Sequence, residues 1–218
     1  MLDYTFDGEY AALYGTVCGT DEAGRGPLCG PVVAAAVVLP DGLVIEGLDD
    51  SKKLTEKKRE KLYDIITENA AAYGIAESSP AEIDEINILN ASLLAMRRAV
   101  EQVKKTVMPS VVLIDGNRQT DFGVPSVTVV KGDARSQSIA AASVLAKVTR
   151  DRIMKELDEK YPDYNLAKHK GYPTFDHMLA VYEYGANEIY RKSFLGCIDK
   201  FHDKLEAALQ AKKQNEQT

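Results

Sequence analysis

The chain has 218 residues, of which 45% are hydrophobic and 28% are charged, and its formal net charge is −6. These values are typical of a globular protein and exclude wholesale disorder. The acidic balance excludes a protein that holds nucleic acid or an anionic membrane through bulk positive charge, but it leaves room for a local basic groove. The length allows one large domain, or one domain with an appendage.

The cysteines and the N-terminus indicate the compartment. Cys18, Cys29 and Cys197 contain no CxxC pair, which favours buried thiols in a reducing compartment over a disulfide framework or a zinc site. The N-terminal segment is acidic, unlike a signal peptide, and the apolar run over residues 32–39 is too short to cross a bilayer as a helix. We therefore expect a cytoplasmic protein.

Strands and helices alternate along the predicted chain. The predicted strands are short runs of β-branched and small apolar residues; they are residues 15–20, 32–39, 43–45, 73–77, 111–114 and 127–130. The predicted helices carry an apolar stripe or begin at a capping residue; they are residues 52–68, a helix after Ser79, residues 136–160, a short helix after Thr174, and a last helix through Ile198 and Leu209. The last two strands are apolar throughout, which is typical of strands covered on both faces. An antiparallel meander followed by strands and helices in alternation predicts an α/β fold, with helices on both faces of a mixed sheet.

Acidic residues follow three of these strands. Asp21 and Glu22 come after the first strand, and Asp115 and Asp133 come after the last two. Because ligands of open α/β sheets bind beyond the carboxyl ends of the parallel strands, we expect these four carboxylates to meet. Crowded carboxylates repel one another unless cations lie between them, and oxygen ligands suit Mg²⁺ or Mn²⁺. The pattern favours two-metal phosphoryl chemistry.

The local geometry of the first acid pair stays open at this point. Neighbouring residues of a regular strand point to opposite faces, so Asp21 and Glu22 share a site only if the strand ends or bulges there. Gly24 and Gly26 favour such an irregularity.

Asp151 is a rival to Asp133 as the fourth acid. It lies 18 residues farther along a predicted helix, which corresponds to about 27 Å, so both cannot serve one site. We expect Asp133 to complete the site, and we expect Asp151 to pair with Lys147 on a solvated helix face.

Seven short motifs follow one another between Thr20 and Tyr172. They are TDEAGRGPL (20–28), GPVVAAA (30–36), DSKKL (50–54), LIDGN (113–117), KGD (131–133), AASVLAKVTRD (141–151) and HKGY (169–172). Together they resemble the signature of bacterial ribonuclease HII. The resemblance implies an RNase H-like fold, with a catalytic domain over residues 1–160, a C-terminal helical extension over residues 161–218 packed on it, and frayed last residues.

The resemblance also implies an activity and a site. Members of that family hydrolyse the RNA strand of RNA–DNA hybrids. They also cut duplex DNA on the 5′ side of single embedded ribonucleotides, which starts ribonucleotide excision repair and leaves a 3′-hydroxyl and a 5′-phosphate. The implied site comprises catalytic and metal-binding acids, a loop that senses the 2′-hydroxyl, and a tyrosine that packs on the adjacent sugar; these match, in turn, Asp21, Glu22, Asp115 and Asp133, then Gly24, Arg25 and Gly26, then Tyr172.

Basic residues near these motifs are candidate phosphate contacts. They are Ser51 with Lys52 and Lys53, Lys147, and the cluster Lys168, His169 and Lys170. Residues 145–218 hold 13 basic and 12 acidic side chains, so the acid excess lies in the part that bears the expected metal site.

The expected partners are RNA–DNA hybrids and ribonucleotide-containing duplexes, with Mg²⁺ or Mn²⁺ as cofactor, two ions per site when substrate is bound. We expect a monomer that binds no membrane, and the tail lacks the Gln-plus-paired-aromatic pattern of a sliding-clamp motif.

Two other function classes remain open. One is a non-catalytic nucleic-acid binding module, although carboxylates without cations would only repel phosphates. The other is a phosphoryl-transfer enzyme for small molecules, against which the absence of a Walker-type loop argues.

Overall fold

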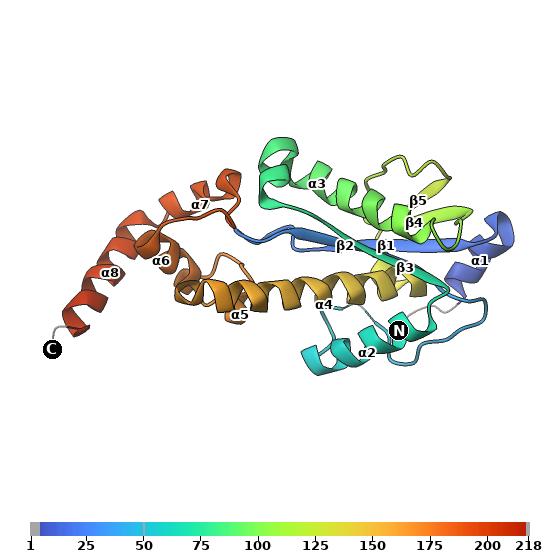
Figure 1. Cartoon of the computed structure of the whole chain (residues 1–218), viewed down its shortest axis with the longest axis horizontal. Helices are drawn as coiled ribbons and strands as arrows, with labels where there is room; N and C mark the ends of the chain where they lie inside the picture. The colour runs from blue at the N-terminus through green and yellow to red at the C-terminus, as the bar shows by residue number, and fades with distance from the viewer. Residues whose placement is uncertain (1–4, 50, 217–218) are drawn as a thin grey trace.

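Five strands form one mixed sheet at the centre of the molecule (Figure 1). The computed structural model describes residues 5–49 and 51–216. In chain order the strands are β1 (Val17–Ala23), β2 (Val32–Val38), β3 (Ala72–Ser78), β4 (Val111–Asp115) and β5 (Ser126–Val129). Their order across the sheet is β3-β2-β1-β4-β5. β1 pairs antiparallel with β2, and β2 with β3, whereas β1, β4 and β5 run parallel. The expected mixed α/β sheet is therefore confirmed.

Helices cover both faces of this sheet. In chain order they are α1 (Phe6–Tyr14), α2 (Glu56–Asn69), α3 (Pro80–Val103), α4 (Gln137–Lys160), α5 (Leu166–His169), α6 (Phe175–Tyr184), α7 (Gly196–Asp199) and α8 (His202–Glu216). Figure 1 shows α3 on one side of the sheet and α4 with α2 on the other. Two buried residues of β2, Ala35 and Val37, pack with α2 and α4, while Ala34 and Ala36 pack with α3. The period of two along a strand thus gives each face its own core.

Capping residues start three of the helices where the sequence predicts them. Ser79 accepts a hydrogen bond from the Glu82 N–H and the Glu82 carboxylate accepts one from the Ser79 N–H, so α3 begins with a capping box. Ser136 caps α4 by accepting from the Ile139 N–H, and Thr174 caps α6. These predictions needed only neighbouring residues, because a cap is a local structure.

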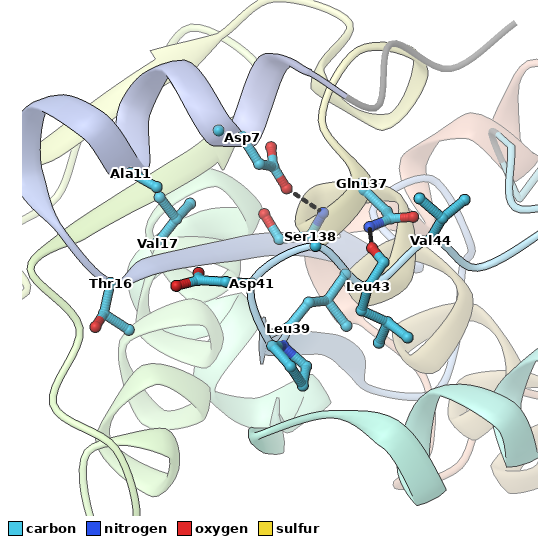
Figure 2. A pocket seen from close by; sticks show the side chains of 13 residues that line it. Asp7, Ala11, Thr16, Val17, Leu39, Asp41, Leu43, Val44, Gln137 and Ser138 are labelled. Atoms are coloured by element: carbon cyan, nitrogen blue, oxygen red, sulfur yellow. Dashed lines mark hydrogen bonds between the residues drawn. The ribbon is translucent and has the colours of Figure 1, made fainter.

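The expected third strand at residues 43–45 is wrong. Instead, this segment is a loop held by Gln137 at the start of α4: its Oε1 accepts from the Ile45 N–H at 2.9 Å and its Nε2 donates to the Leu43 carbonyl at 2.6 Å. Figure 2 shows the second of these bonds, beside the one from the Ser138 N–H to Asp7 of α1. The side chain satisfies the backbone groups that a neighbouring strand would otherwise pair. The third meander strand is β3, at the other predicted position.

Three further expectations about elements need correction. β5 is an edge strand, and its residues are mostly half-buried rather than covered on both faces. The last predicted helix is two helices, α7 and α8, with a break at Lys200 and Phe201. α8 continues to Glu216, so the polar end is helical up to that residue. Residues 217–218, and Asp50 of the motif DSKKL, lie outside the described residues.

The residues after Lys160 share a hydrophobic core with the segment between β1 and β2 and with α4. Leu28 and Cys29, from the segment between β1 and β2, pack with Met154 of α4 and with residues of α6 and α8 such as Met178 and Leu205. Cys18 and Cys29 are buried, Cys197 is partly exposed, and all three are free thiols. Over the described ranges, the helices are too short or too polar to cross a bilayer.

Candidate active site

Asp21 and Asp115 lie side by side at the carboxyl ends of two parallel strands. The register of β1 and β4 pairs Thr20 with Ile114, and the next position on each strand is one of these acids. Asp21 is buried, with 5% of its surface exposed. β1 runs antiparallel to β2 and parallel to β4. Ligands of open α/β sheets bind beyond the carboxyl ends of the parallel strands, which is where these acids lie.

Glu22 joins them from the other face of β1. β1 stays in regular register with β2 as far as Ala23, so the expected strand end or bulge at the acid pair is wrong. Asp21 receives a hydrogen bond from Ser143 of α4, while Glu22 lines a small pocket with Asp115 and residues of α3. Both carboxylates still reach the site because they flank the end of the sheet, with one on each side of it.

Burial and mutual repulsion shift the pKa of both acids upward. The pKa of Asp21 lies well above its usual range, chiefly because burial disfavours the charged carboxylate and then because Glu22 and Asp115 are close. Burial also raises the pKa of Glu22, and the Arg25 guanidinium, 3.2 Å from its Oε1, opposes this shift. Three carboxyl groups are therefore close enough to feel one another's charge.

The backbone of Asp133 is hydrogen-bonded to the side chain of Asp115. The Asp115 Oδ1 accepts hydrogen bonds from the N–H groups of Gly132 at 2.7 Å and Asp133 at 3.3 Å. Asp133 sits in the short 3₁₀ helix Gly132–Ala134 and is 7% exposed. Its Oδ2 is 3.8 Å from the Lys52 Nζ. The position fits the fourth acid that the sequence predicts.

The donor set suits a divalent cation. Within residues 5–49 and 51–216, no three His, Cys, Asp or Glu side chains already stand in the geometry of a metal site. However, the donors are all carboxylate oxygens. Burial, and then the charges of Glu22 and Asp115, raise the pKa of Asp21, and a cation would relieve the cost of ionising it. Asp21, Glu22, Asp115 and Asp133 are thus the residues that could hold Mg²⁺ or Mn²⁺, which prefer such ligands.

Asp151 occupies a different place from the one expected. It pairs with Lys147 at 2.6 Å, as predicted, but it is 4% exposed rather than solvated. Arg59 of α2 approaches its other oxygen at 3.7 Å and donates to the Ser51 carbonyl at 3.0 Å. Through Arg59, Asp151 therefore helps to hold the segment before α2. The helix face expected to be solvated is buried, because α2 and α4 pack together.

A pocket of about 250 Å³ opens next to the acids. It is lined by Asp21 and Glu22, the loop residues Gly24, Arg25 and Gly26, and Ser51, Lys52, Ser143, Lys147, Arg150 and Tyr172. Gly24 has φ +97°, and a Cβ there would fall 2.0 Å from the Arg150 Nε, so only glycine fits. Tyr172 is 45% exposed and lies against Gly26. The structure thus brings the loop and the tyrosine, which the sequence motifs place far apart, to one pocket.

The basic candidates divide into two groups. Lys52 and Lys147 line the pocket together with Ser51, whose hydroxyl is 2.9 Å from that of Ser143. Lys170 instead donates to the Ala167 carbonyl at 2.7 Å, and burial lowers its pKa.

Three other basic candidates lie away from the pocket. His169 is buried, with its Nε2 2.9 Å from the Tyr164 carbonyl, so it is a core side chain. Lys168 pairs with Asp176 on the surface, and Lys53 pairs with Asp49.

Sequence reasoning missed several residues that shape this pocket. Ser143 and Arg150 lie within the motif 141–151 but received no role, since a serine and an arginine on a helix give no local signal of what they touch. Arg59 and Arg191 lie outside the motifs. Arg191 donates to the Gly24 carbonyl and Arg59 approaches the Asp151 carboxylate; both partners are remote in sequence, so only the fold reveals them.

Two bacterial relatives align with more than four fifths of this chain. Ribonuclease HII of Azoarcus sp. is 56% identical over 178 residues, which cover 82% of this chain and 86% of the relative. Ribonuclease HII of Acetivibrio thermocellus is 54% identical over 185 residues, covering 85% of this chain and 72% of the relative.

Solved structures share the fold. Ribonuclease H2 from Pyrococcus horikoshii is 28% identical with a TM-score of 0.69, covering 85% of this chain and 97% of that one. RNase HII of Archaeoglobus fulgidus, solved as a complex with PCNA, is 25% identical with a TM-score of 0.64, covering 81% and 92%. Bst-RNase HIII in complex with Mn²⁺ is 16% identical with a TM-score of 0.61, covering 82% and 67%.

The family described as ribonuclease HII matches residues 18–197 of this sequence. That range contains the acids, the loop, the tyrosine and both lysines of the pocket. The chain therefore belongs to the ribonuclease HII family and is an endonuclease of the ribonuclease H class.

Proposed function

We propose that this protein hydrolyses the RNA strand of RNA–DNA hybrids and cuts duplex DNA on the 5′ side of single embedded ribonucleotides, as the first step of ribonucleotide excision repair. The observation that carries this proposal is the shared pocket, in which buried acids stand beside a glycine-rich loop and an exposed tyrosine. Acids alone would suit many phosphoryl-transfer reactions. A neighbouring loop whose backbone is open to a sugar adds a reason to select RNA, because the 2′-hydroxyl is the group that distinguishes RNA from DNA.

Divalent cations are part of the proposal. Asp21, Glu22, Asp115 and Asp133 would hold two Mg²⁺ or Mn²⁺ ions, and the structure of Bst-RNase HIII with Mn²⁺ supports this class of ion. Bound there, the ions would activate water for in-line attack and stabilise the departing 3′-oxygen, giving a 3′-hydroxyl and a 5′-phosphate. A non-catalytic binding module is disfavoured, because buried acids that repel one another would weaken phosphate binding without serving any chemistry.

The protein's own side chains would bind and orient the duplex. Lys52 and Lys147 are placed to contact phosphates, which positions a substrate without reading its sequence. Tyr172 presents an exposed ring beside Gly26, where it would pack on the sugar next to the ribonucleotide. The loop Gly24–Gly26 would sense the 2′-hydroxyl through its backbone, because glycine lets a ligand approach without a Cβ in the way.

Assembly and compartment are also proposals. We expect a monomer in the cytoplasm that binds no membrane. The PCNA complex is a property of the Archaeoglobus fulgidus protein.

Cleavage of a duplex with one embedded ribonucleotide tests the function. With Mg²⁺ or Mn²⁺ the wild-type protein should cut the duplex, and EDTA should stop it. Asp21→Asn and Asp115→Asn should reduce cutting by about 100-fold or more, since each removes a charge that the reaction uses, while binding of the duplex largely survives. Asp41→Asn, a change of an exposed acid outside the pocket, is the matched control and should cut normally. Full activity in both site variants would rule out the assignment of the acids.

A further inference from the structure

Arg191 is a fully buried arginine that holds the loop between β1 and β2. Its exposed fraction is 0%. The Nε donates to the Gly30 carbonyl, the Nη1 donates to the carbonyls of Arg25 and Pro27, and the Nη2 donates to those of Gly24 and Gly30, at 2.7–3.1 Å. A guanidinium has five N–H donors, and all of them are used on one short stretch of backbone.

The Arg191 guanidinium is not in an ion pair, although the more distant Asp84 carboxylate partly offsets its charge. Among the residues that the structure describes, neither Arg191 nor the nearby Arg150 forms an ion pair. Arg150, 1% exposed, donates to the carbonyls of Pro31, Cys29 and Lys170. Burial, and then the neighbouring Arg150, lower the pKa of Arg191 to about 9. A buried charge is costly unless it is fully hydrogen-bonded, so carbonyl dipoles of this loop replace a counter-ion.

These bonds fix which way the loop's peptide groups face. A trans peptide points its C=O and its N–H in opposite directions, and the described chain has no cis peptide bonds. The carbonyls of Gly24 and Arg25 point to Arg191. The N–H groups of Arg25 and Gly26, which belong to the same two peptides, therefore point away from it. Gly24, Arg25 and Gly26 line the pocket beside the acids, so outward N–H groups are donors available to a ligand there.

We propose that Arg191 is a positioning residue for ribonucleotide recognition: by drawing in the carbonyls of the loop Gly24–Gly26, it presents the loop's N–H groups to the substrate sugar. The inference rests on the proposed function, and it assigns the specificity of a loop near the N-terminus to a residue of the C-terminal extension. Asp84 of α3 anchors the segment after Arg191, since its carboxylate accepts from the N–H groups of Lys192 at 2.8 Å and Ser193 at 2.9 Å.

The test compares discrimination in Arg191→Lys with that of the wild type. Lysine keeps the charge but has only three donors and no planar fork. The readouts are the KM for a duplex with one ribonucleotide and the inhibition constant of the matched all-DNA duplex, both measured during turnover. Losing the orientation of one or two hydrogen bonds should raise the KM about 10-fold, with the inhibition constant and kcat within about twofold. Arg152→Lys, a partly exposed arginine outside the pocket, should change neither constant.

Asp84→Ala provides a second variant, because Arg191→Lys alters a buried site and could fail to fold. The Asp84 position is partly exposed, and its loss should loosen the segment that carries Arg191 and raise the KM in the same direction, by about threefold. Glu85→Ala, an exposed acid next along α3, is the control. A folded Arg191→Lys or Asp84→Ala protein whose ratio of the two constants matches the wild type would overturn the inference and leave the proposed function standing. A wild-type protein that does not cut the ribonucleotide duplex would instead refute the proposed function.

Discussion

When it is ionised, Asp21 carries a charge that the folded chain itself does not balance. It is buried beside Glu22 and Asp115, and the hydrogen bonds from Ser143 and from the Glu22 N–H only partly offset the cost. A carboxyl group in this position favours its protonated form. The site therefore trades stability of the metal-free protein for affinity toward cations, which is a common feature of functional sites.

This trade predicts how Asp21→Asn changes stability with pH. The folded pKa of Asp21 lies above its usual value of 3.8, so ionisation destabilises the folded state as pH rises through that folded pKa, and the cost is absent at low pH where the carboxyl is protonated in both states. In EDTA at pH 7, Asp21→Asn should melt at a higher temperature than the wild type, and the gain should shrink as the pH falls toward 4. Calorimetry across this range measures it. An equal or lower melting temperature of Asp21→Asn at pH 7 would contradict the proposed cost of ionising the buried Asp21 carboxyl group.

Single contacts also distinguish Asp133 from Asp151 as the proposed fourth acid. Asp133 contacts Asp115 through its backbone N–H and stands near Lys52. Asp151 is occupied by Lys147 and Arg59. Its charge already has two basic partners within the protein, whereas the Lys52 ammonium that faces Asp133 is mostly exposed and 3.8 Å away.

Asp133→Asn and Asp151→Asn should therefore fail in different ways. Asp133→Asn should lower kcat by about 100-fold or more with little change in stability. Asp151→Asn should reduce the free energy of unfolding by about 1–3 kcal/mol, because it weakens the hydrogen bond to the partly exposed Lys147 and the ion pair with Arg59, and should reduce kcat/KM by no more than about 10-fold. Urea unfolding and steady-state cleavage separate the two effects. A folded but inactive Asp151→Asn protein, with an active Asp133→Asn protein, would reverse the assignment.

At the scale of elements, sequence predicted what neighbouring residues determine and missed what distant ones determine. The caps at Ser79, Ser136 and Thr174 are local and were predictable. The loop at residues 43–45 is held by Gln137, more than ninety positions away, and no pattern within the loop reveals that contact. Asn87, at φ 65°, kinks α3 by accepting from the Asn90 N–H, within a stretch whose apolar period reads as one helix.

The candidate site divides in the same way. The acids, the loop and the tyrosine could be found because each lies in a recognisable motif at a predictable strand end or turn. The regular course of β1 through Asp21 and Glu22 could not be predicted, because it depends on the pairing of β1 with β2. Arg191 and Arg59 could not be found either, since Arg191 contacts the Gly24 carbonyl and Arg59 contacts Asp151, both far away in the sequence.

The C-terminal elements should be required for folding of the catalytic part. We propose the division into residues 1–160 and 161–218, but Leu28, Cys29 and Met154 of the first part lie in the core of the second. A chain ending at Lys160 exposes these side chains and loses Arg191, so it should lack a cooperative melting transition and bind a hydrophobic dye. A chain ending at Lys213, which removes only the polar end of α8, should melt like the full chain. A cooperative, active 1–160 fragment would contradict this dependence.

At the scale of the whole molecule, the net charge of −6 is compatible with a nucleic-acid substrate. Residues 145–218 are nearly neutral, with 13 basic and 12 acidic side chains, so the acid excess lies in the part that bears Asp21, Glu22, Asp115 and Asp133. Those four acids would be offset by cations when substrate is bound. Binding then relies on a few local lysines, and we expect a modest dependence on salt, because few phosphates are neutralised.

The position of the cut tests the central claim most directly. A duplex with one ribonucleotide, labelled at each end of the modified strand in turn, is incubated with the protein and Mg²⁺ or Mn²⁺, and the products are sized against synthetic markers. The proposed function predicts a single cut on the 5′ side of the ribonucleotide, leaving a 3′-hydroxyl and a 5′-phosphate, with the all-DNA duplex intact. A cut on the 3′ side, or equal cutting of the all-DNA duplex, would contradict recognition of the ribonucleotide by the loop beside the acids.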